Sequence, residues 1–290
     1  MSRPGPRRRM RTLLLTAGGV LVSIYVLAPF SWLVLTSFMH EKDVLSVPLK
    51  LSWNSFTFNN YLSFVHASGV TAVVGSRAAE NTLPAIVNSL IAATATAALN
   101  LLLGTLAGYS FARMRFPGRM PLLMLYLGSR MVPGIALIVP LYLTIRSLHL
   151  LDSLLALTLT YLTLTLPFTI WLMKNYFQGI ARSLEEAAMV DGCNWWQMLW
   201  RVLVPVAAPG LAAAAIFAFM TAWNDYLFAV ILTTTMAAET APVVVAGFVT
   251  DVTTARTLMA TGGVLAVLPP LVLALLSQRL IVQGLTSGAV

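Results

Sequence analysis

Two groups of polar side chains lie inside long apolar stretches of the sequence, where they could contact a polar ligand. One is Arg130, within Ser-Arg-Met-Val-Pro-Gly at positions 129–134, and the other is the run Trp223, Asn224 and Asp225. A charged group at the centre of a bilayer costs at least about 2.5 kcal/mol, so each needs a physical reason. Because an aromatic ring beside hydrogen-bonding groups suits a polyhydroxy compound, these residues are candidates for lining a path for such a solute.

Both groups also have plainer explanations, which stay open. Arg130 follows a glycine and precedes a proline, which indicates a helix irregularity lining a cavity, but it could equally pair with an acidic residue or a partner protein. Asp225 lies about 20 residues beyond Pro205, which at about 1.5 Å per residue places it ~30 Å further along a helix. That is near the outer end of a membrane span, where an interfacial position would explain Asp225 without any role in binding.

The sequence predicts neither a catalytic centre nor a cofactor or metal site in this chain. A lone cysteine, Cys193, excludes an intrachain disulfide and a multi-cysteine metal site, and His40, His66 and His149 show no ligand spacing. No G-x4-G-K-[ST] phosphate loop occurs, so the chain cannot bind ATP in the manner of P-loop proteins. An ATP-driven process would need a partner subunit to bind the ATP and Mg²⁺.

The composition determines which elements must position these residues. Hydrophobic residues make up 58% of the chain and charged residues 10%, which is typical of a polytopic membrane protein. The net charge of +8 does not indicate nucleic-acid binding, because the basic residues punctuate apolar runs. Crossing a bilayer core of about 30 Å takes roughly 20 apolar helical residues. Six runs qualify, predicting an all-α membrane protein with transmembrane helices at about 13–38, 84–111, 121–145, 154–173, 206–232 and 258–280.

The arginines and lysines predict the orientation. The first apolar run is too long for a signal-peptide core and lacks a small-x-small cleavage site, so it is predicted to be an uncleaved span. With a cytoplasmic N-terminus, the inner segments hold twelve basic residues and the outer segments five. The prediction is a membrane domain over 13–283 with cytoplasmic tails at 1–12 and 284–290.

The inner segment between the fourth and fifth spans has a distinctive pattern. Ser183-Leu-Glu-Glu186 fits a capping box for a short helix that starts at Leu184 and ends near Gly192. Asn194-Trp-Trp-Gln197 offers a second start signal, and one apolar face would follow from Trp195, Met198, Leu199 and Val202. Exposed apolar residues on such helices usually have a partner, although an amphipathic linker lying on the membrane would explain them equally.

This segment resembles the EAA motif of ABC importer permeases, E-A-A-x3-G-x9-I-x-L-P. Glu186-Ala-Ala188 is followed after three residues by Gly192 and after nine more by Val202-Leu-Val-Pro205, with valine in place of the isoleucine and leucine. The resemblance implies that residues 184–205 form a cytoplasmic coupling helix that docks in a cleft of the ATP-binding subunit. The coupling residues it implies are Glu186, Ala187, Ala188, Asp191, Gly192, Val202 and Pro205.

Further strings narrow the resemblance to the maltose-type carbohydrate permeases. They include Asn88-Ser-Leu90, Ala107-Gly-Tyr-Ser-Phe-Ala-Arg113, Phe116-Pro-Gly-Arg119, Trp223-Asn-Asp-Tyr-Leu-Phe228 and Gln283-Gly-Leu-Thr-Ser-Gly-Ala289. The family implies a multi-pass permease in the bacterial inner membrane, surrounded by lipid, that forms a path for a sugar-like solute. Its partners would be a homologous second permease, two ATP-binding subunits and an extracytoplasmic solute-binding protein, with no nucleic acid.

Two questions stay open at this level. The outer loop at 233–257 corresponds in the family to a contact with the solute-binding protein, but its apolar core at 241–247 also fits a short re-entrant packing element. An ion-coupled secondary transporter is the alternative to an importer, and it would need carboxylates near the middle of the spans or matched broken helices. No acidic residue lies near the middle of any predicted span, which favours the importer. A disaccharide, an amino sugar, a polyol and a glycerophosphodiester all fit as solutes.

Overall fold

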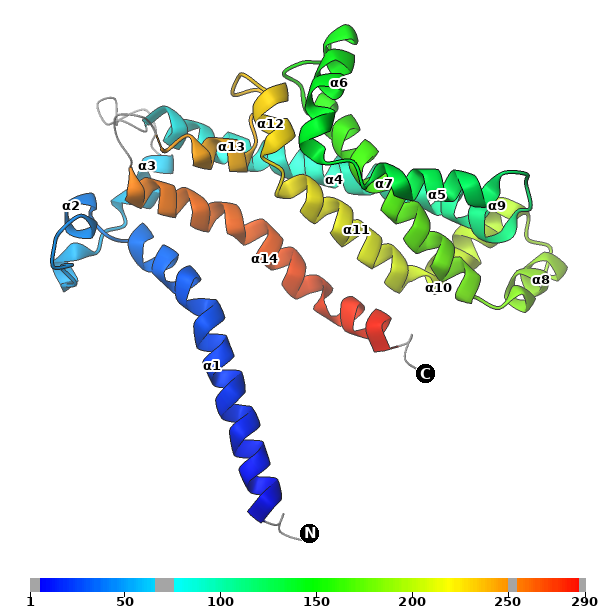
Figure 1. The fold of residues 1–290 in the computed structure, drawn as a ribbon, viewed down its shortest axis with the longest axis horizontal. Coiled ribbons are helices and arrows are strands. Elements are labelled where there is room, and N and C mark those ends of the chain that lie inside the picture. The colour runs from blue at the N-terminus through cyan, green and yellow to red at the C-terminus, as the bar shows by residue number, and fades with distance from the viewer. Residues whose placement is uncertain (1–5, 66–75, 250–254, 287–290) are drawn as a thin grey trace. The chain divides into compact units, whose positions relative to one another are not determined.

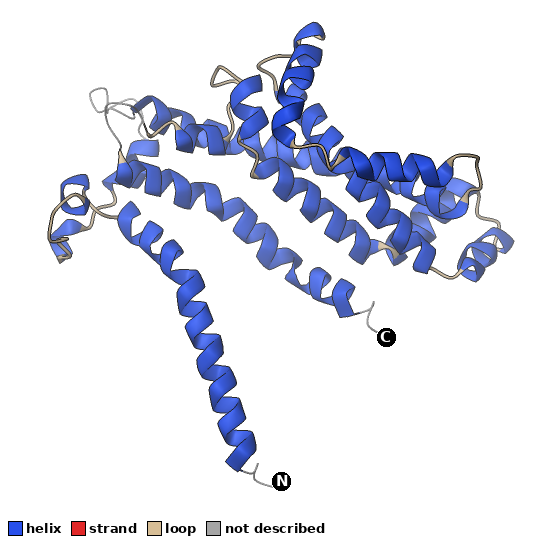
Figure 2. Ribbon diagram, in the orientation of Figure 1, coloured by secondary structure: helices blue, strands red, loops and turns tan. Residues whose placement is uncertain are grey.

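The computed structural model describes residues 6–65, 76–249 and 255–286 of the chain, and Figure 2 shows only helices and loops in that part. The long helices are α1 (Pro6–Ser37), α4 (Ser76–Arg113), α7 (Leu154–Gly179), α11 (Ala208–Trp223) and α14 (Arg256–Thr286). The shorter ones are α2 (Glu41–Val44), η1 (Trp53–Ser55), α3 (Asn59–Val65), α5 (Arg119–Ser129), α6 (Gly134–Ser147), α8 (Arg182–Val190), α9 (Trp195–Gln197), η3 (Met198–Leu203), α10 (Val204–Val206), α12 (Leu227–Leu232) and α13 (Ala241–Ala246).

The described helices provide four spans by themselves and six if two bent pairs are counted as one span each. The four are Met10–Ser37, Ala79–Arg113, Leu154–Gly179 and Arg256–Ser277. α5 and α6 meet at an angle of 100°, and the segment Trp195–Val206 meets α11 at 80°. The helix irregularity predicted at Arg130 is therefore confirmed, because α5 ends at Ser129 and α6 begins at Gly134, with Pro133 as its N-cap residue. The run at 206–232 also differs from one continuous helix, since α11 ends at Trp223 and α12 begins at Leu227.

The chain divides into two compact units, of which Met1–Glu80 and Val245–Leu265 form the first. In this unit the short helices α2, η1 and α3 lie in the segment that follows α1. The Glu41 carboxylate accepts hydrogen bonds from the N–H groups of Arg256 (3.1 Å) and Thr257 (2.8 Å) at the start of α14. An anion at a helix N-terminus satisfies amides that have no partner within the helix, so Glu41 fixes where α14 begins.

The second unit, Asn81–Val244 with Ala266–Val290, contains the helices that position the candidate site. α7 and α11 lie side by side (Figure 1), and a Cβ added at Gly210 of α11 would lie 2.5 Å from the ring of Tyr176 on α7. α4 approaches α7 equally closely, since a Cβ at Gly108 would lie 2.6 Å from the Met173 Cβ. Small residues that let helix backbones approach are typical of packing within membranes, where the hydrophobic effect does not drive helices together.

Candidate functional site

The EAA segment, defined here as residues 182–206 (α8 to α10), folds as two helical parts joined at Gly192. Gly192 has φ = +86° with open space around it, so glycine is required there for its backbone conformation. Asn194 and Gln197 form the second predicted capping box, with both backbone-to-side-chain hydrogen bonds at 2.9 Å. The predicted helix end near Gly192 and the predicted second helix start are confirmed.

The first predicted capping box is wrong. α8 begins at Arg182 rather than at Leu184, and its N-cap residue is Ala181, which offers no side-chain hydrogen bond. Ser183 therefore lies inside the helix. The physical reason is tertiary: the start of α8 is held by a buried contact of Glu185, which a local capping pattern does not contain.

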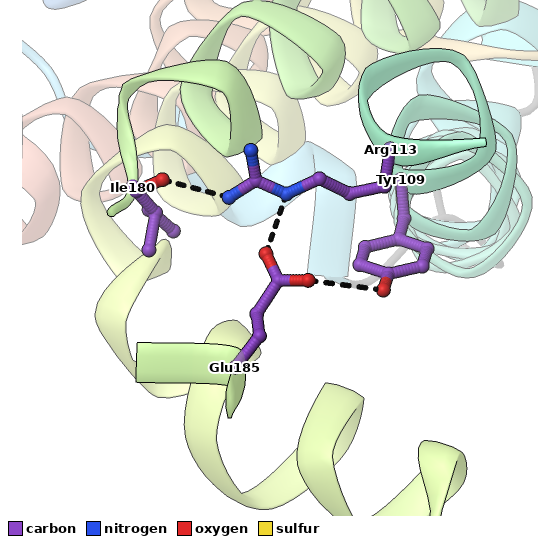
Figure 3. A network of polar contacts seen from close by, with 4 residues as sticks. All are labelled: Tyr109, Arg113, Ile180 and Glu185. Atoms are coloured by element: carbon purple, nitrogen blue, oxygen red, sulfur yellow. Dashed lines mark hydrogen bonds and ion pairs between the residues drawn. The ribbon is translucent and has the colours of Figure 1, made fainter. Parts of the chain in front are cut away.

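That contact is a network between α4, the end of α7 and the first turn of α8 (Figure 3). The Nε of Arg113 donates to Oε1 of Glu185 at 2.5 Å, and its Nη2 donates to the carbonyl oxygen of Ile180 at 2.7 Å. The Tyr109 hydroxyl donates to the other carboxylate oxygen of Glu185 at 3.3 Å. The two charged side chains are 9% and 15% exposed, so the ion pair is largely withdrawn from water.

Sequence reasoning missed this network. Glu185 stands beside the motif residue Glu186, and Arg113 ends one of the family-like strings, but they are 72 positions apart. No periodicity or local spacing connects residues at that separation. One feature of the sequence could have indicated a partner for Glu185: of the two adjacent glutamates Glu185 and Glu186, only Glu186 belongs to the motif, so Glu185 needs another explanation.

The inner face of the EAA segment packs into an apolar cluster. Met198 and Leu199 are fully buried and Trp195 and Val202 partly so, which confirms the predicted face. The motif residue Ala188 is buried in the same cluster. The partners come from α4 and α7: the Tyr109 ring lies 5.7 Å from that of Phe177 and 5.5 Å from that of Trp195, both edge-on. These contacts attach the segment firmly to the membrane helices.

The outer face of α8 is exposed and mostly apolar. Val190 is 87% exposed and Met189 51%, while Ala187 and the carboxylates of Glu186 and Asp191 are also exposed. Among the described residues, Glu186 has no hydrogen bond or ion pair. The motif residues thus divide into an inward pair, Ala188 and Val202, and the outward set Glu186, Ala187, Asp191, Gly192 and Pro205. An apolar strip that carries unpaired acidic groups is suited to a partner with a basic rim.

Arg130 lies at the break between α5 and α6, with its side chain exposed in this chain. Its guanidinium carbon is 5.1 Å from the ring centroid of Phe217 on α11 and 5.6 Å from that of Phe168 on α7. Contacts of this kind hold the cation without using its N–H donors, so these are available to a further ligand. The two phenylalanines were not predicted, because aromatic residues are common in apolar runs.

The second group of candidates lies around the break between α11 and α12. Trp223 is 3% exposed and stacks on Phe219 at 5.7 Å within the core. Asn224 is exposed, whereas one oxygen of Asp225 accepts from the N–H groups of Phe228 and Ala229, both at 3.1 Å. Asp225 therefore caps α12, which gives this carboxylate a structural role at the break.

The first part of the predicted outer loop at 233–257 is fixed at both ends. Asp152, in the turn between α6 and α7, accepts from the N–H groups of Thr234 (2.8 Å) and Thr235 (3.0 Å) and from the Thr235 hydroxyl (2.6 Å). At the other end, Asn88 of α4 donates to the Glu239 carbonyl at 3.0 Å. Residues 234–237 form an exposed tip between these anchors, while residues 250–254 lie outside the described part.

Replacing Asp152 with asparagine is expected to loosen this loop in a pH-dependent way. Partial burial raises the pKa of Asp152, but hydrogen bonds from the Thr235 hydroxyl and from the N–H groups of Thr234 and Thr235 outweigh it and lower the pKa overall. Because its pKa is lower in the folded chain than the unfolded value of about 3.9, ionised Asp152 stabilises the fold above that pH. This stabilisation is lost as the pH falls through the folded pKa. In detergent, Asp152→Asn should melt below wild type at pH 7, and the gap should narrow below about pH 4. If the melting temperatures of wild type and Asp152→Asn differed by the same amount at pH 7 and below about pH 4, this role of Asp152 would be contradicted.

Comparisons with known proteins agree with the family expected from the motif. Residues 100–287 match the family "Binding-protein-dependent transport system inner membrane component". The chain is 36% identical over 272 residues to the trehalose transport system permease protein SugB of Mycobacterium tuberculosis, covering 93% of this chain and 94% of that protein. It is 33% identical over 285 residues to the trehalose/maltose transport system permease protein MalG of Thermococcus litoralis, covering 97% of each.

The fold also has a solved counterpart. The structure is similar to a chain of a bacterial ABC transporter involved in the import of the acidic polysaccharide alginate, with a TM-score of 0.78, 20% identity, and coverage of 96% of this chain and 99% of that one. At this identity the likeness concerns the fold alone.

Proposed function

Because the chain belongs to the family of binding-protein-dependent transport system inner membrane components, we propose that it forms, with a second permease, the membrane path of an ATP-driven importer for a sugar or sugar-like solute. It is an ABC transporter permease, a multi-pass protein of the inner membrane. The family membership favours the importer over an ion-coupled secondary transporter. Permeases for trehalose and maltose among the relatives support a disaccharide as the solute.

The observation that carries this proposal is the two-sided EAA segment. Its inner face is packed into the membrane domain, and its outer face carries exposed apolar residues with the unpaired Glu186. When a partner bound to the outer face moves, such a segment can transmit that movement to the membrane helices against which its inner face packs. We assign the outer face to the ATP-binding subunits, which would bind ATP and Mg²⁺ and perform the hydrolysis. We also propose that both termini are cytoplasmic, which would put this face on the side of the ATP, and the excess of basic residues in the inner segments supports that orientation.

The solute path in this proposal passes Arg130. At about 1.5 Å per residue, the 11 residues of α5 place Arg130 about 16 Å from the start of that helix, near the middle of the bilayer. The rings of Phe168 and Phe217 are adjacent, with centroids 4.3 Å apart, and the guanidinium lies over this pair with its N–H donors free. Free donors beside aromatic rings suit the hydroxyl groups and the faces of a sugar. Asn224 would contribute a second polar contact, while the buried Trp223 and the capping Asp225 would hold the helix break that presents it. The exposed tip at 234–237 is the part of the outer loop proposed to meet the solute-binding protein.

Reconstitution tests the proposed function. The tagged chain, purified in mild detergent with the proteins that accompany it, is placed in vesicles with the solute-binding protein, and uptake of radiolabelled trehalose and maltose is measured with and without MgATP. We expect MgATP-dependent uptake of at least one of them, lowered severalfold by Arg130→Gln and unchanged by Arg146→Gln, an exposed arginine at the end of α6.

Each arm of this experiment has a distinct failure. Absence of any ATPase from the purified wild-type complex would overturn the importer assignment itself. Normal uptake by Arg130→Gln would remove Arg130 from the path, and loss of the second permease from that variant would assign Arg130 to the contact between permeases instead.

A further inference from the structure

We propose that Arg113 and Glu185 are positioning residues that transmit movement of the EAA segment to the cytoplasmic ends of α4 and α7. The inference rests on the proposed function, because it concerns how force received by the outer face of α8 enters the membrane domain. Arg113 is the last residue of α4, and Glu185 lies in the first turn of α8. No other ion pair joins α8 to a membrane helix in the described part of the chain.

One guanidinium connects three helices. Arg113 belongs to α4, its Nε donates to the Glu185 carboxylate of α8, and its Nη2 donates to the carbonyl of Ile180, the C-cap residue of α7. The terminal carbonyls of a helix have no partner within the helix, and a cation there is favourable. The planar fork of arginine can make both contacts at fixed angles, which the single ammonium group of lysine cannot.

The network is suited to transmitting displacement because its charged groups are largely buried and both oxygens of the Glu185 carboxylate are hydrogen-bonded. With side chains 9% and 15% exposed, the pair is poorly screened by water, and separating the two charges would leave each of them without compensation. The second oxygen of Glu185 is held by Tyr109, one turn earlier on α4. A shift of the α8 backbone relative to the end of α4 therefore strains both hydrogen bonds of the Glu185 carboxylate, those from Arg113 and from Tyr109.

The two neighbouring glutamates then have different tasks. Consecutive residues on an α-helix point about 100° apart, so Glu186 can face a partner while Glu185 faces the membrane domain. Glu186 is exposed and Glu185 is not. In this arrangement Glu186 contacts the ATP-binding subunit, and Glu185 transmits the movement to the membrane helices. A substitution at Glu186 should therefore weaken binding of the ATP-binding subunit, whereas one at Glu185 should weaken transmission.

The test separates transmission from docking and from simple stability. Wild type, Arg113→Glu, Glu185→Arg and the double exchange are purified as complexes, placed in vesicles and assayed with MgATP, with and without the solute-binding protein. The readouts are the amount of co-purified ATP-binding subunit and the stimulation of ATP hydrolysis by the binding protein. Arg115→Glu, a charge reversal at an exposed residue two positions further on, is the matched control.

We expect each single reversal to retain the ATP-binding subunits but to reduce stimulation at least fivefold, with Arg115→Glu behaving as wild type. The double exchange should recover about half of the stimulation or more, because it restores the pair but turns a carboxylate towards the Ile180 carbonyl. Wild-type stimulation in both single variants would overturn the proposal. Loss of the ATP-binding subunits from Glu185→Arg would also overturn it, because that result would place Glu185 in the docking contact. A double exchange with no more stimulation than the single variants would overturn it as well. A wild-type complex without ATPase would instead contradict the proposed function.

Discussion

Reversing the charge of Glu186 is expected to strip the ATP-binding subunits from the purified complex. Its carboxylate is exposed beside the apolar Met189 and Val190, and within the described residues it has no partner. In the docked state it would make a charge-assisted hydrogen bond, and truncating one side of such a buried pair typically costs about 2–5 kcal/mol. An arginine adds repulsion to that loss. Affinity for the ATP-binding subunits should therefore fall by a factor of roughly 30 or more.

The measurement is the ratio of ATP-binding subunit to tagged permease after affinity purification in mild detergent. Asp43→Arg, the same charge reversal on the short helix α2 of the predicted outer side, controls for the change in net charge. If Glu186→Arg retains the wild-type ratio, the outer face of α8 does not bind the ATPase through this carboxylate.

Replacing Gly108 with valine is expected to prevent α4 from packing against α7. Even a Cβ at this position would lie 2.6 Å from the Met173 Cβ and 3.0 Å from the backbone nitrogen of Lys174. A backbone atom cannot move aside as a flexible side chain can, so the helices themselves would have to separate. Overpacking typically costs 1–3 kcal/mol and occasionally more, and here we expect at least about 3 kcal/mol.

Thermal unfolding and size-exclusion profiles in detergent would measure this effect. Gly128→Val is the matched control, because Gly128 lies on α5 with no atom within 4 Å of an added Cβ. We expect the Gly108 variant to aggregate or melt well below wild type and the Gly128 variant to behave nearly as wild type. Equal melting of the two variants would show that the contact between α4 and α7 tolerates a larger separation.

The sequence predicted the elements of this protein better than the contacts between them. Long apolar runs can satisfy their backbone polar groups in lipid only as helices, so the membrane helices followed from composition. Gly192 and Asn194 were correctly assigned because a bend and a capping box are local. The packed face of Met198 and Leu199 followed from helical periodicity in the same way.

What could not be predicted depends on residues far apart in the chain. Ser183 was assigned a cap that tertiary contacts made unnecessary, because Glu185 is held by Arg113, 72 positions earlier. Likewise, Trp223 is of a residue type that often contacts sugars, but it is buried against Phe219, and this burial depends on the packing of the core. A single sequence specifies such pairs only through the whole fold.

The break between α5 and α6 has a consequence for how the protein is made. At about 1.5 Å per residue, α5 with 11 residues and α6 with 14 residues reach only about 16 Å and 21 Å, so neither can cross a hydrocarbon layer of about 30 Å by itself. The backbone groups freed between them, together with the charge of Arg130, would face lipid until other protein surfaces cover them. Phe168 and Phe217, whose rings contact the Arg130 guanidinium, are synthesised later in the chain. Insertion of this region is therefore expected to finish only after α7 and α11 have left the ribosome, as a step of assembly among helices rather than the entry of one helix into the membrane.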